Sequence, residues 1–409
     1  MATAPAVADL LAPTAWPELF ARRAARGGDE LTAILSLAAA TDVITFSGGF
    51  PAPETFPVDV LHQLVSQLLA EDSARALQYS PTEGLQPARA AVAGLLRDRQ
   101  GATVDADDVL VTSGGIEALA LLAKTFVDTG DRVVVEAPSY LGAIMAFAGF
   151  EAQVESVQVD DGGLRVDELE QLLSSGVRPK LVYVIPDHQN PTGLSLAADR
   201  RAPLVDLCRR YGVLLVEDVA YRELGFDDDA PPSLWSLGPD VVVQIGTFSK
   251  IFAPGVRLGW AVGPSTVIKA MTAAKQNTDQ CSGALGQMLM AEFVTAGHLD
   301  RNLVVARRLY ESRATTMVGA LEEHMPDGYT WTRPRGGFFV WLTGPEDVDA
   351  RALVAPAARL GVAYVPGSPF YTDGRGGNCF RLAYSRATED DITEGVRRLG
   401  TLLRSGSND

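Results

Sequence analysis

Lys250 lies in a short polar loop that directly follows an apolar run of the sequence. The run Val241–Ile245 is typical of a buried strand, and Gly246 marks where that strand ends. Arg257 follows Lys250 seven residues later, in the same loop region. An amine and a guanidinium on one loop are rarely buried in a hydrophobic core. They suit a ligand that carries an aldehyde and a phosphate, because an amine condenses with the first and a guanidinium binds the second.

Small residues follow a second apolar run. Val109–Thr112 is followed by Ser113–Ile116, which open a helical segment. Backbone amides at a helix N-terminus bind phosphate, and missing side chains let the anion approach. A glycine pair at a helix start is also common without any ligand. Tyr140 follows a third run, Arg132–Glu136, where it is placed to stack on an aromatic ring, although an ordinary loop tyrosine fits there equally well.

Two further strand ends carry polar side chains. Asn190 follows the run Leu181–Ile185 in a turn-forming Asn-Pro-Thr-Gly stretch, and an ordinary turn is its simplest interpretation. Asp218 and Tyr221 follow the run Val213–Val216. A carboxylate that leaves a buried strand is costly to bury without a cationic partner. A protonated pyridine nitrogen is such a partner.

Each of these elements alone is modest evidence, but together they occur in order and each stands at a strand end. They predict a site for pyridoxal 5'-phosphate (PLP), in which Lys250 forms the Schiff base with the cofactor. Asp218 then keeps the pyridine nitrogen protonated, while Asn190 and Tyr221 contact the phenolic oxygen. Ser249 and Arg257 are candidates for the phosphate oxygens.

Short apolar runs alternate with helix-period segments between about residue 105 and residue 300. This alternation predicts an α/β fold with a mostly parallel central sheet, whose functional loops leave the carboxyl ends of the strands. After residue 300 a long amphipathic segment and three short strands predict a smaller α+β domain. The expected organisation is an arm over the active site at 1–40, a large cofactor-binding domain at 41–300 and a small domain at 301–409.

Composition narrows the class of protein. The chain has 409 residues and a net charge of −16, which argues against nucleic acid or an anionic membrane as a partner. Three scattered cysteines and four histidines without ligand spacing predict neither a disulfide framework nor a metal site. No signal peptide or membrane-spanning run is evident, so a cytoplasmic location is expected.

The motifs resemble those of the fold-type I PLP-dependent enzymes of the class I/II aminotransferase family. Within it, the branch of α-aminoadipate and kynurenine aminotransferase-like enzymes is most similar. The resemblance extends from about residue 30 to the last helix. Its matching stretches are Ser47–Glu54, Leu77–Gly84, Gln189–Gly193, Glu217–Glu223, Phe248–Gly259 and Gly336–Val340.

The resemblance implies further roles. Arg381 matches the arginine that binds the substrate α-carboxylate, and Gly49 matches a backbone donor to the same group. Tyr79 matches a tyrosine that reaches the partner's phosphate in a homodimer with shared active sites. The expected cofactor-binding residues are Tyr79, Ser113, Gly114, Gly115, Ile116, Tyr140, Asn190, Asp218, Tyr221, Thr247, Ser249, Lys250 and Arg257. The expected catalytic residues are Lys250, Asp218 and Tyr221, and the substrate-binding residues are Gly49, Asn190 and Arg381.

The reaction expected from the resemblance is transfer of an amino group between an L-amino acid and a 2-oxo acid. β-Elimination, such as C–S lysis, or decarboxylation remains an alternative on the same scaffold. A non-enzymatic effector domain of a transcription regulator is a further alternative, disfavoured by the short N-terminal segment and the negative charge. His188 and the Gly115–Ile116 pair depart from the branch's usual residues. Arg22, Arg23 or Arg26 is a candidate for binding a second substrate carboxylate.

Overall fold

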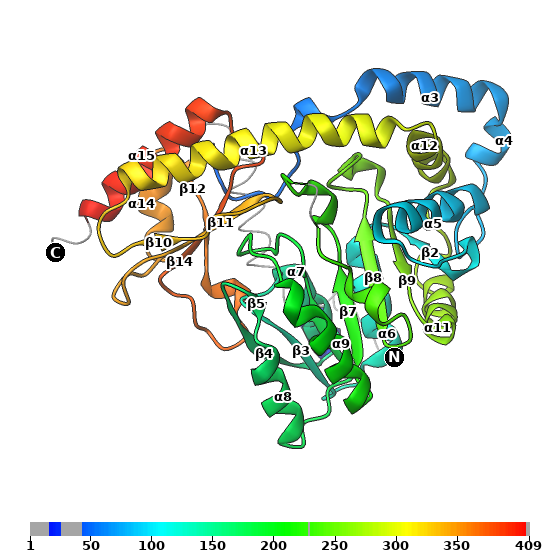
Figure 1. Ribbon diagram of the computed structural model, residues 1–409, viewed down its shortest axis with the longest axis horizontal. Helices are drawn as coiled ribbons and strands as arrows, with labels where there is room; N and C mark the ends of the chain where they lie inside the picture. The colour runs from blue at the N-terminus through cyan, green and yellow to red at the C-terminus, as the bar shows by residue number, and fades with distance from the viewer. Residues whose placement is uncertain (1–15, 26–42, 228–229, 406–409) are drawn as a thin grey trace, which may run out of the picture.

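The computed structural model describes residues 16–25, 43–227 and 230–405. Its core contains an eight-stranded sheet in a large part and a separate four-stranded sheet in a smaller C-terminal part. A long helix, α13 (His298–His324), extends along one side of the molecule over both parts (Figure 1). The predicted α/β fold with a second, smaller α+β part is confirmed by this arrangement.

The eight-stranded sheet is mostly parallel. Strands β8, β7, β6, β3 and β4 run parallel to one another, whereas β9 runs antiparallel to both β2 and β8, and β5 runs antiparallel to β4. In spatial order the strands are β2 (Val109–Thr112), β9 (Gly259–Val262), β8 (Val242–Thr247), β7 (Leu214–Asp218), β6 (Leu181–Val184), β3 (Arg132–Ala137), β4 (Gln153–Asp160) and β5 (Gly163–Leu164).

Helices cover this sheet on both faces. Consecutive residues of β2, β6, β8 and β9 are all buried, and successive side chains of a strand point to opposite faces. The helices of this part are α5 (Gln86–Gln100), α6 (Gly115–Phe126), α7 (Leu141–Gly149), α8 (Val166–Ser174), α9 (Ala198–Tyr211), α10 (Leu234–Leu237), α11 (Ser265–Gln276) and α12 (Ala284–Thr295). The 3₁₀ turns are η4 (Ala106–Asp108), η5 (Arg222–Leu224) and η6 (Pro254–Val256).

The C-terminal part is built on the four-stranded sheet. Its strands, in spatial order, are β10 (Thr330–Trp331), β11 (Phe339–Thr343), β14 (Cys379–Ala383) and β13 (Val365–Pro366). The helices α13 (His298–His324), α14 (Val354–Arg359) and α15 (Glu389–Ser405) accompany them, with the turn η7 (Ser368–Phe370). Helices α13 and α15 lie side by side along one edge of the molecule (Figure 1).

The chain reaches the C-terminal part early. Strand β1 (Ile44–Thr45) pairs in parallel with β12 (Val362–Ala363), although the expected boundary at residue 41 assigned it to the large domain. The turn η3 (Pro53–Thr55) and the helices α3 (Val58–Glu71) and α4 (Ser73–Ala76) then lead to the large sheet. These contacts explain how the Ser47–Glu54 stretch comes to lie at the junction of the two parts.

Two elements of the N-terminal arm are described, α1 (Trp16–Leu19) and η2 (Arg22–Ala25). Arg23 is exposed in η2. Arg26 and most of the expected arm lie outside the described residues. None of the described helices combines the length and apolarity that a membrane crossing requires.

The predicted apolar runs form strands, and β2 has the predicted bounds, but β8 continues through Gly246 to Thr247, so the prediction that Gly246 marks the strand end is wrong. Strands β4, β5 and β9 were not anticipated. Strand β4 mixes polar and apolar residues instead of forming an apolar run, and only Val157 in it is buried. Strand β9 follows the lysine loop without an intervening α-helix. Helix α13 begins at His298, so it spans the expected boundary at residue 300.

Gly246 has no room for a side chain in β8. A Cβ atom there would overlap the indole of Trp260, its partner on β9. Gly246→Ala should therefore destabilise the fold by about 1–3 kcal/mol, the usual cost of overpacking a core. Gly255→Ala is the matched control, because a Cβ at Gly255 meets nothing within 4 Å. Denaturant unfolding of both variants checks this, and equal stabilities would contradict the packing described.

Candidate active site

The carboxyl ends of five strands deliver the predicted site residues to one edge of the large sheet. Strands β2, β3, β6, β7 and β8 end at Thr112, Ala137, Val184, Asp218 and Thr247. The segments that follow carry Gly114, Tyr140, Asn190, Tyr221 and Lys250. From the C-terminal part, β14 contributes Arg381. The fold thus brings together residues that are far apart in the sequence.

The Lys250 amine is held by protein groups on several sides. Its Nζ donates to the carbonyl oxygen of Gly49 at 2.8 Å and lies 5.7 Å from the ring centroid of Phe338. Burial lowers the pKa of this amine to about 8, and the positive charges of Arg381 and Arg257 act in the same direction. A substantial fraction of the amine is therefore neutral near physiological pH, as a nucleophile or base requires.

Asp218 is the buried carboxylate of the site. Its two oxygens accept hydrogen bonds from the Tyr183 hydroxyl at 2.7 Å and from the Ala220 amide at 3.1 Å. Burial raises the pKa of this carboxyl to about 6, while the two donors and the Lys250 charge oppose that rise. Tyr183 was missed from the sequence. Its signal is a tyrosine inside an apolar strand, since a buried phenol needs a hydrogen-bond partner.

Arg381 presents a guanidinium group with unused hydrogen-bonding capacity. Its Nη1 donates to Asn190 Oδ1 at 3.0 Å and its Nη2 to the Ser47 carbonyl at 2.6 Å. Its Nε is buried and has no hydrogen-bond partner among the described residues. The guanidinium lies 4.5 Å from the ring centroid of Phe339. Burial lowers the pKa of Arg381 to about 10. A buried, incompletely paired guanidinium is suited to a carboxylate.

Two tyrosines line the same region. Tyr221 is 4% exposed and makes edge-on contacts with Phe338 and Phe339, at centroid distances of 5.4 and 5.8 Å. Burial raises the pKa of both Tyr221 and Tyr140, so each hydroxyl keeps its proton. Tyr140 stands directly before α7. Both can therefore donate a hydrogen bond to a bound ligand.

The predicted phosphate end is tightly built around Gly114. This residue has φ of 94° directly before α6, and an added Cβ would lie 2.6 Å from Arg257 Nη2. Arg257 itself adopts φ of 56° and donates through Nη2 to the Ser113 carbonyl at 3.2 Å. Thr247 Oγ1 donates to Ser249 Oγ at 3.0 Å. A glycine-lined helix start beside a guanidinium and two hydroxyls fits a phosphate group.

These observations test the cofactor against the residues present. A partly neutral lysine amine, a buried carboxylate, a helix start without side chains and an arginine with a spare donor all match PLP. Gly49 contributes a carbonyl contact to Lys250, and a Cβ there would lie 2.6 Å from the Phe339 ring. Gly115 is the first residue of α6 and directly follows Gly114.

The side chains of two predicted cofactor residues are exposed to solvent in the single chain. Tyr79 is 76% exposed and Ile116 is 44% exposed. Their exposure suits residues that meet a second subunit, and the role of Tyr79 stays a prediction.

His188, one of the departures from the branch's usual residues, packs tightly against its neighbours. It has φ of 50°, and its ring packs so closely against Gly336 that an added Cβ there would lie 2.5 Å from the imidazole. Its amide donates to Ser195 Oγ at 3.0 Å. Burial lowers the pKa of the imidazole, which is therefore neutral near pH 7. The residue supports the junction between the two parts of the chain.

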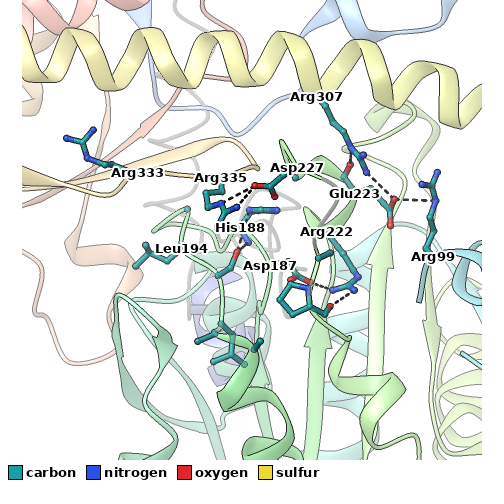
Figure 2. A pocket seen from close by; sticks show the side chains of 18 of the residues that line it. Arg99, Asp187, His188, Leu194, Arg222, Glu223, Asp227, Arg307, Arg333 and Arg335 are labelled. Atoms are coloured by element: carbon teal, nitrogen blue, oxygen red, sulfur yellow. Dashed lines mark hydrogen bonds and ion pairs between the residues drawn. The ribbon is translucent and has the colours of Figure 1, made fainter. Parts of the chain in front are cut away.

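A separate cavity of about 640 Å³ lies at this junction (Figure 2). Its lining includes His188, Arg222 and Arg335 but none of the residues that meet at Lys250. Four of the labelled guanidinium groups pair with carboxylates of the lining: Arg222 with Asp187 at 2.7 Å, Arg335 with Asp227, and both Arg99 and Arg307 with Glu223. Positive and negative side chains are therefore paired around this cavity. The predicted catalytic residues lie elsewhere, around Lys250.

Comparison with known proteins identifies the class to which this fold and site belong. Residues 41–399 match the family model "Aminotransferase class I and II". Among curated relatives, "Aromatic-amino-acid aminotransferase 1" of Thermococcus litoralis is 38% identical and covers 97% of this chain and 96% of its own length. The "2-aminoadipate transaminase" of Thermus thermophilus is 38% identical and covers 96% of this chain and 98% of its own.

A solved structure gives the same answer. The kynurenine aminotransferase of Pyrococcus horikoshii superimposes with a TM-score of 0.93 at 36% identity, over 97% of this chain and 99% of its own. The chain belongs to the class I and II aminotransferase family. More particularly, it is a PLP-dependent amino-acid aminotransferase, so the resemblance, the enzyme class and the cofactor expected from the sequence are confirmed. The regulator-type effector domain is set aside.

Among the described residues, no cluster of three or more histidine, cysteine, aspartate or glutamate side chains is arranged to hold a metal ion.

The lowered pKa of Lys250 makes a pH-dependent prediction. The chain freed of cofactor should take up PLP faster as pH rises through about 8, because only the neutral amine attacks the aldehyde. An unperturbed lysine would instead titrate near ~10.4. Stopped-flow absorbance of cofactor uptake measures this midpoint. Asp218→Asn should move it to lower pH, since the aspartate charge favours the ammonium form. A wild-type midpoint near ~10 would contradict the described environment.

Proposed function

We propose that Lys250 carries the cofactor covalently and that Asp218, Arg381 and the α6 N-terminus hold the reacting groups around it. The observation that supports this most strongly is the environment of the Lys250 amine, which is buried near Arg381, Arg257 and Asp218. Its pKa is lowered to about 8 by burial, with Arg381 and Arg257 adding to the effect and Asp218 opposing it. The enzyme moves an amino group between an L-amino acid and a 2-oxo acid.

When bound, PLP supplies an electron-withdrawing ring that stabilises negative charge at the substrate α-carbon. Asp218 holds a proton on the pyridine nitrogen, and Tyr183 keeps the carboxylate oriented through its 2.7 Å hydrogen bond. Asn190 and Tyr221 would hold the phenolic oxygen by hydrogen bonds, and Tyr140 would pack against the ring. The Ser249 hydroxyl, the Arg257 guanidinium and the amides of Gly114, Gly115 and Ile116 hold the phosphate.

Arg381 orients the amino acid substrate. Its Nε has no partner among the described residues, so an arriving carboxylate gains a hydrogen bond without displacing one from that atom. Asn190 and the Ser47 carbonyl fix the plane of the guanidinium through two further bonds. A substrate held by this fork presents its α-carbon to Lys250, and the Gly49 amide adds a donor to the same carboxylate.

Lys250 moves the proton. The Lys250 Nζ would remove the proton from the substrate α-carbon as a general base and would later donate it as a general acid, while bound PLP would supply the electron-withdrawing ring that stabilises the negative charge. A pKa of about 8 suits both steps, because the amine gains and loses a proton readily near neutral pH. Hydrolysis releases the 2-oxo acid, and a second 2-oxo acid runs the steps in reverse.

The donor we propose is an α-amino acid with a large side chain. The relatives named above act on aromatic amino acids, 2-aminoadipate and kynurenine, as their names state. These substrates share the α-amino carboxylate that suits Arg381 and differ in the side chain. A contribution of Arg22, Arg23 or Arg26 to a second carboxylate remains part of this proposal. A cytoplasmic location is proposed with it.

A homodimer with shared sites completes the proposal. Tyr79 is 76% exposed, which leaves its side chain available to a second chain. Its amide donates to Gln78 Oε1 at 2.9 Å, and the next residue, Ser80, donates to the Ser282 carbonyl at 3.0 Å. These bonds fix the segment that presents Tyr79 outward.

Lys250→Ala should abolish turnover, lowering kcat by more than ~10³-fold, because both proton transfers lose their carrier. Arg381→Lys should instead raise KM for the amino acid by roughly tenfold or more, since a lysine offers no fork. Lys269→Ala, at an exposed site on α11, is the control and should behave as wild type. Steady-state assays with aromatic, 2-aminoadipate and small aliphatic donors and 2-oxoglutarate measure these effects. Full activity of Lys250→Ala, or ammonia release without a 2-oxo acid acceptor, would contradict the proposal.

Shared sites predict that two impaired variants rescue each other, because Lys250→Ala lacks the reactive amine and Tyr79→Ala lacks the proposed phosphate contact across the interface. Lys250→Ala and Tyr79→Ala chains, denatured together and refolded, should form hybrid dimers in which one site has both native residues. Activity should therefore exceed that of either variant refolded alone. Sedimentation should give twice the 43.5 kDa mass of the chain. A monomer, or hybrids without regained activity, would refute the shared site.

A further inference from the structure

A buried lysine lies close to the predicted phosphate end and takes no part in the proposed reaction. Lys275, in α11, is fully buried. Its Nζ donates to both carboxylate oxygens of Glu117, at 2.9 and 2.8 Å. It also donates to both oxygens of Asp279, at 2.8 and 2.7 Å. One ammonium group thus joins two carboxylates, from α6 and from the segment after α11.

The two carboxylates converge on a single residue, Ser113. Glu117 Oε2 accepts the Ser113 amide at 2.5 Å, and Asp279 Oδ2 accepts the Ser113 hydroxyl at 2.9 Å. The Ser113 carbonyl accepts Arg257 Nη2 at 3.2 Å. All three polar groups of Ser113 are therefore fixed, and the next residues in the chain are Gly114 and the first turn of α6.

The hydroxyl of Ser113 already donates to Asp279, so its single proton is committed within the protein. This makes Ser113 a poor direct ligand for a phosphate and a good anchor for the backbone that follows it. The amides of Gly114, Gly115 and Ile116 carry the binding, and no hydroxyl or amide side chain at these three positions assists them. Donors on a glycine-rich turn depend on the backbone being held in place, because glycine restricts it little.

We propose that Lys275, with Glu117 and Asp279, forms an ionic brace that positions the α6 amides for the cofactor phosphate by fixing Ser113. Lys275 is a positioning residue in this scheme, since it acts through its two carboxylate partners. The inference rests on the proposed function of the Lys250 site.

Lys275 brings one positive charge to the two carboxylates of the brace. Burial raises the pKa of Glu117, against the opposing effects of Lys275 and of the Ser113 amide. The pKa of Asp279 is lowered, because the hydrogen bonds and the charge of Lys275 outweigh the effect of burial.

The test compares PLP with pyridoxal, which has the same aldehyde and ring but no phosphate. Equilibrium binding to the full-length chain freed of cofactor gives both dissociation constants. Asp279→Asn and Glu117→Gln should each weaken PLP binding by roughly tenfold, the effect of losing a hydrogen bond to a charged group, and should leave pyridoxal binding unchanged. Lys124→Gln is the matched control. Lys124 also joins α6 to the end of α11, through Ala274 and Thr278, but contacts no member of the brace.

A double-mutant cycle tests whether the brace acts through Ser113. The effect of Asp279→Asn on PLP affinity should largely vanish in a Ser113→Ala background, because the bond that transmits it is already absent. Lys275→Met leaves two carboxylates without a cation and is expected to unfold readily, so the two isosteric carboxylate variants carry the test.

Additive effects of Asp279→Asn and Ser113→Ala would overturn the brace. So would equal losses of PLP and pyridoxal affinity, which would indicate a general structural defect. A wild-type chain that binds neither compound would refute the proposed function, and with it this inference. A wild-type chain that binds both, with variants that match it, would refute the brace alone.

Discussion

The burial of one amine among like charges is the constraint on which the site depends. Lys250 lies in a region that also holds the guanidinium groups of Arg381 and Arg257, and both charges disfavour its ammonium form. Water no longer stabilises that form fully, so the pKa of the amine falls to about 8. The negative charge of Asp218 acts in the opposite direction and keeps the pKa of the Lys250 amine from falling further. The residues whose charges shift the pKa of Lys250 are the same ones that are proposed to bind the cofactor and the substrate.

The parallel sheet makes this arrangement possible. Strands β8, β7, β6 and β3 run in one direction, so their carboxyl ends open on the same edge and their loops converge. The C-terminal part adds Arg381 from β14, and the early segment after β1 adds the carbonyls of Ser47 and Gly49. The two parts thus share the site, and movement of one against the other would change the contacts of Arg381. Buried pairs at the junction, such as Arg222 with Asp187, hold the large part rigid beneath it.

Local sequence patterns were sufficient for the groups that stand at strand ends. Lys250, Asp218 and Asn190 were predictable because an apolar run followed by a polar residue marks both the end of a strand and the position of a functional loop. The partners of these residues were not predictable in the same way. Tyr183 contacts Asp218 from a neighbouring strand, and Lys275 contacts Glu117 across 158 positions of the sequence. Such pairs are set by which helices and strands pack together, and no local spacing encodes them.

The account rests on Lys250 as the residue that holds the cofactor. Borohydride reduction of the holoenzyme, followed by proteolysis and mass spectrometry, tests this directly, because reduction fixes PLP to the amine that carries it. A single pyridoxyl modification on the peptide that contains Lys250, absent from the Lys250→Ala variant, is the predicted result. A modification on Lys275, on Lys269 or on another lysine in place of Lys250 would contradict the account.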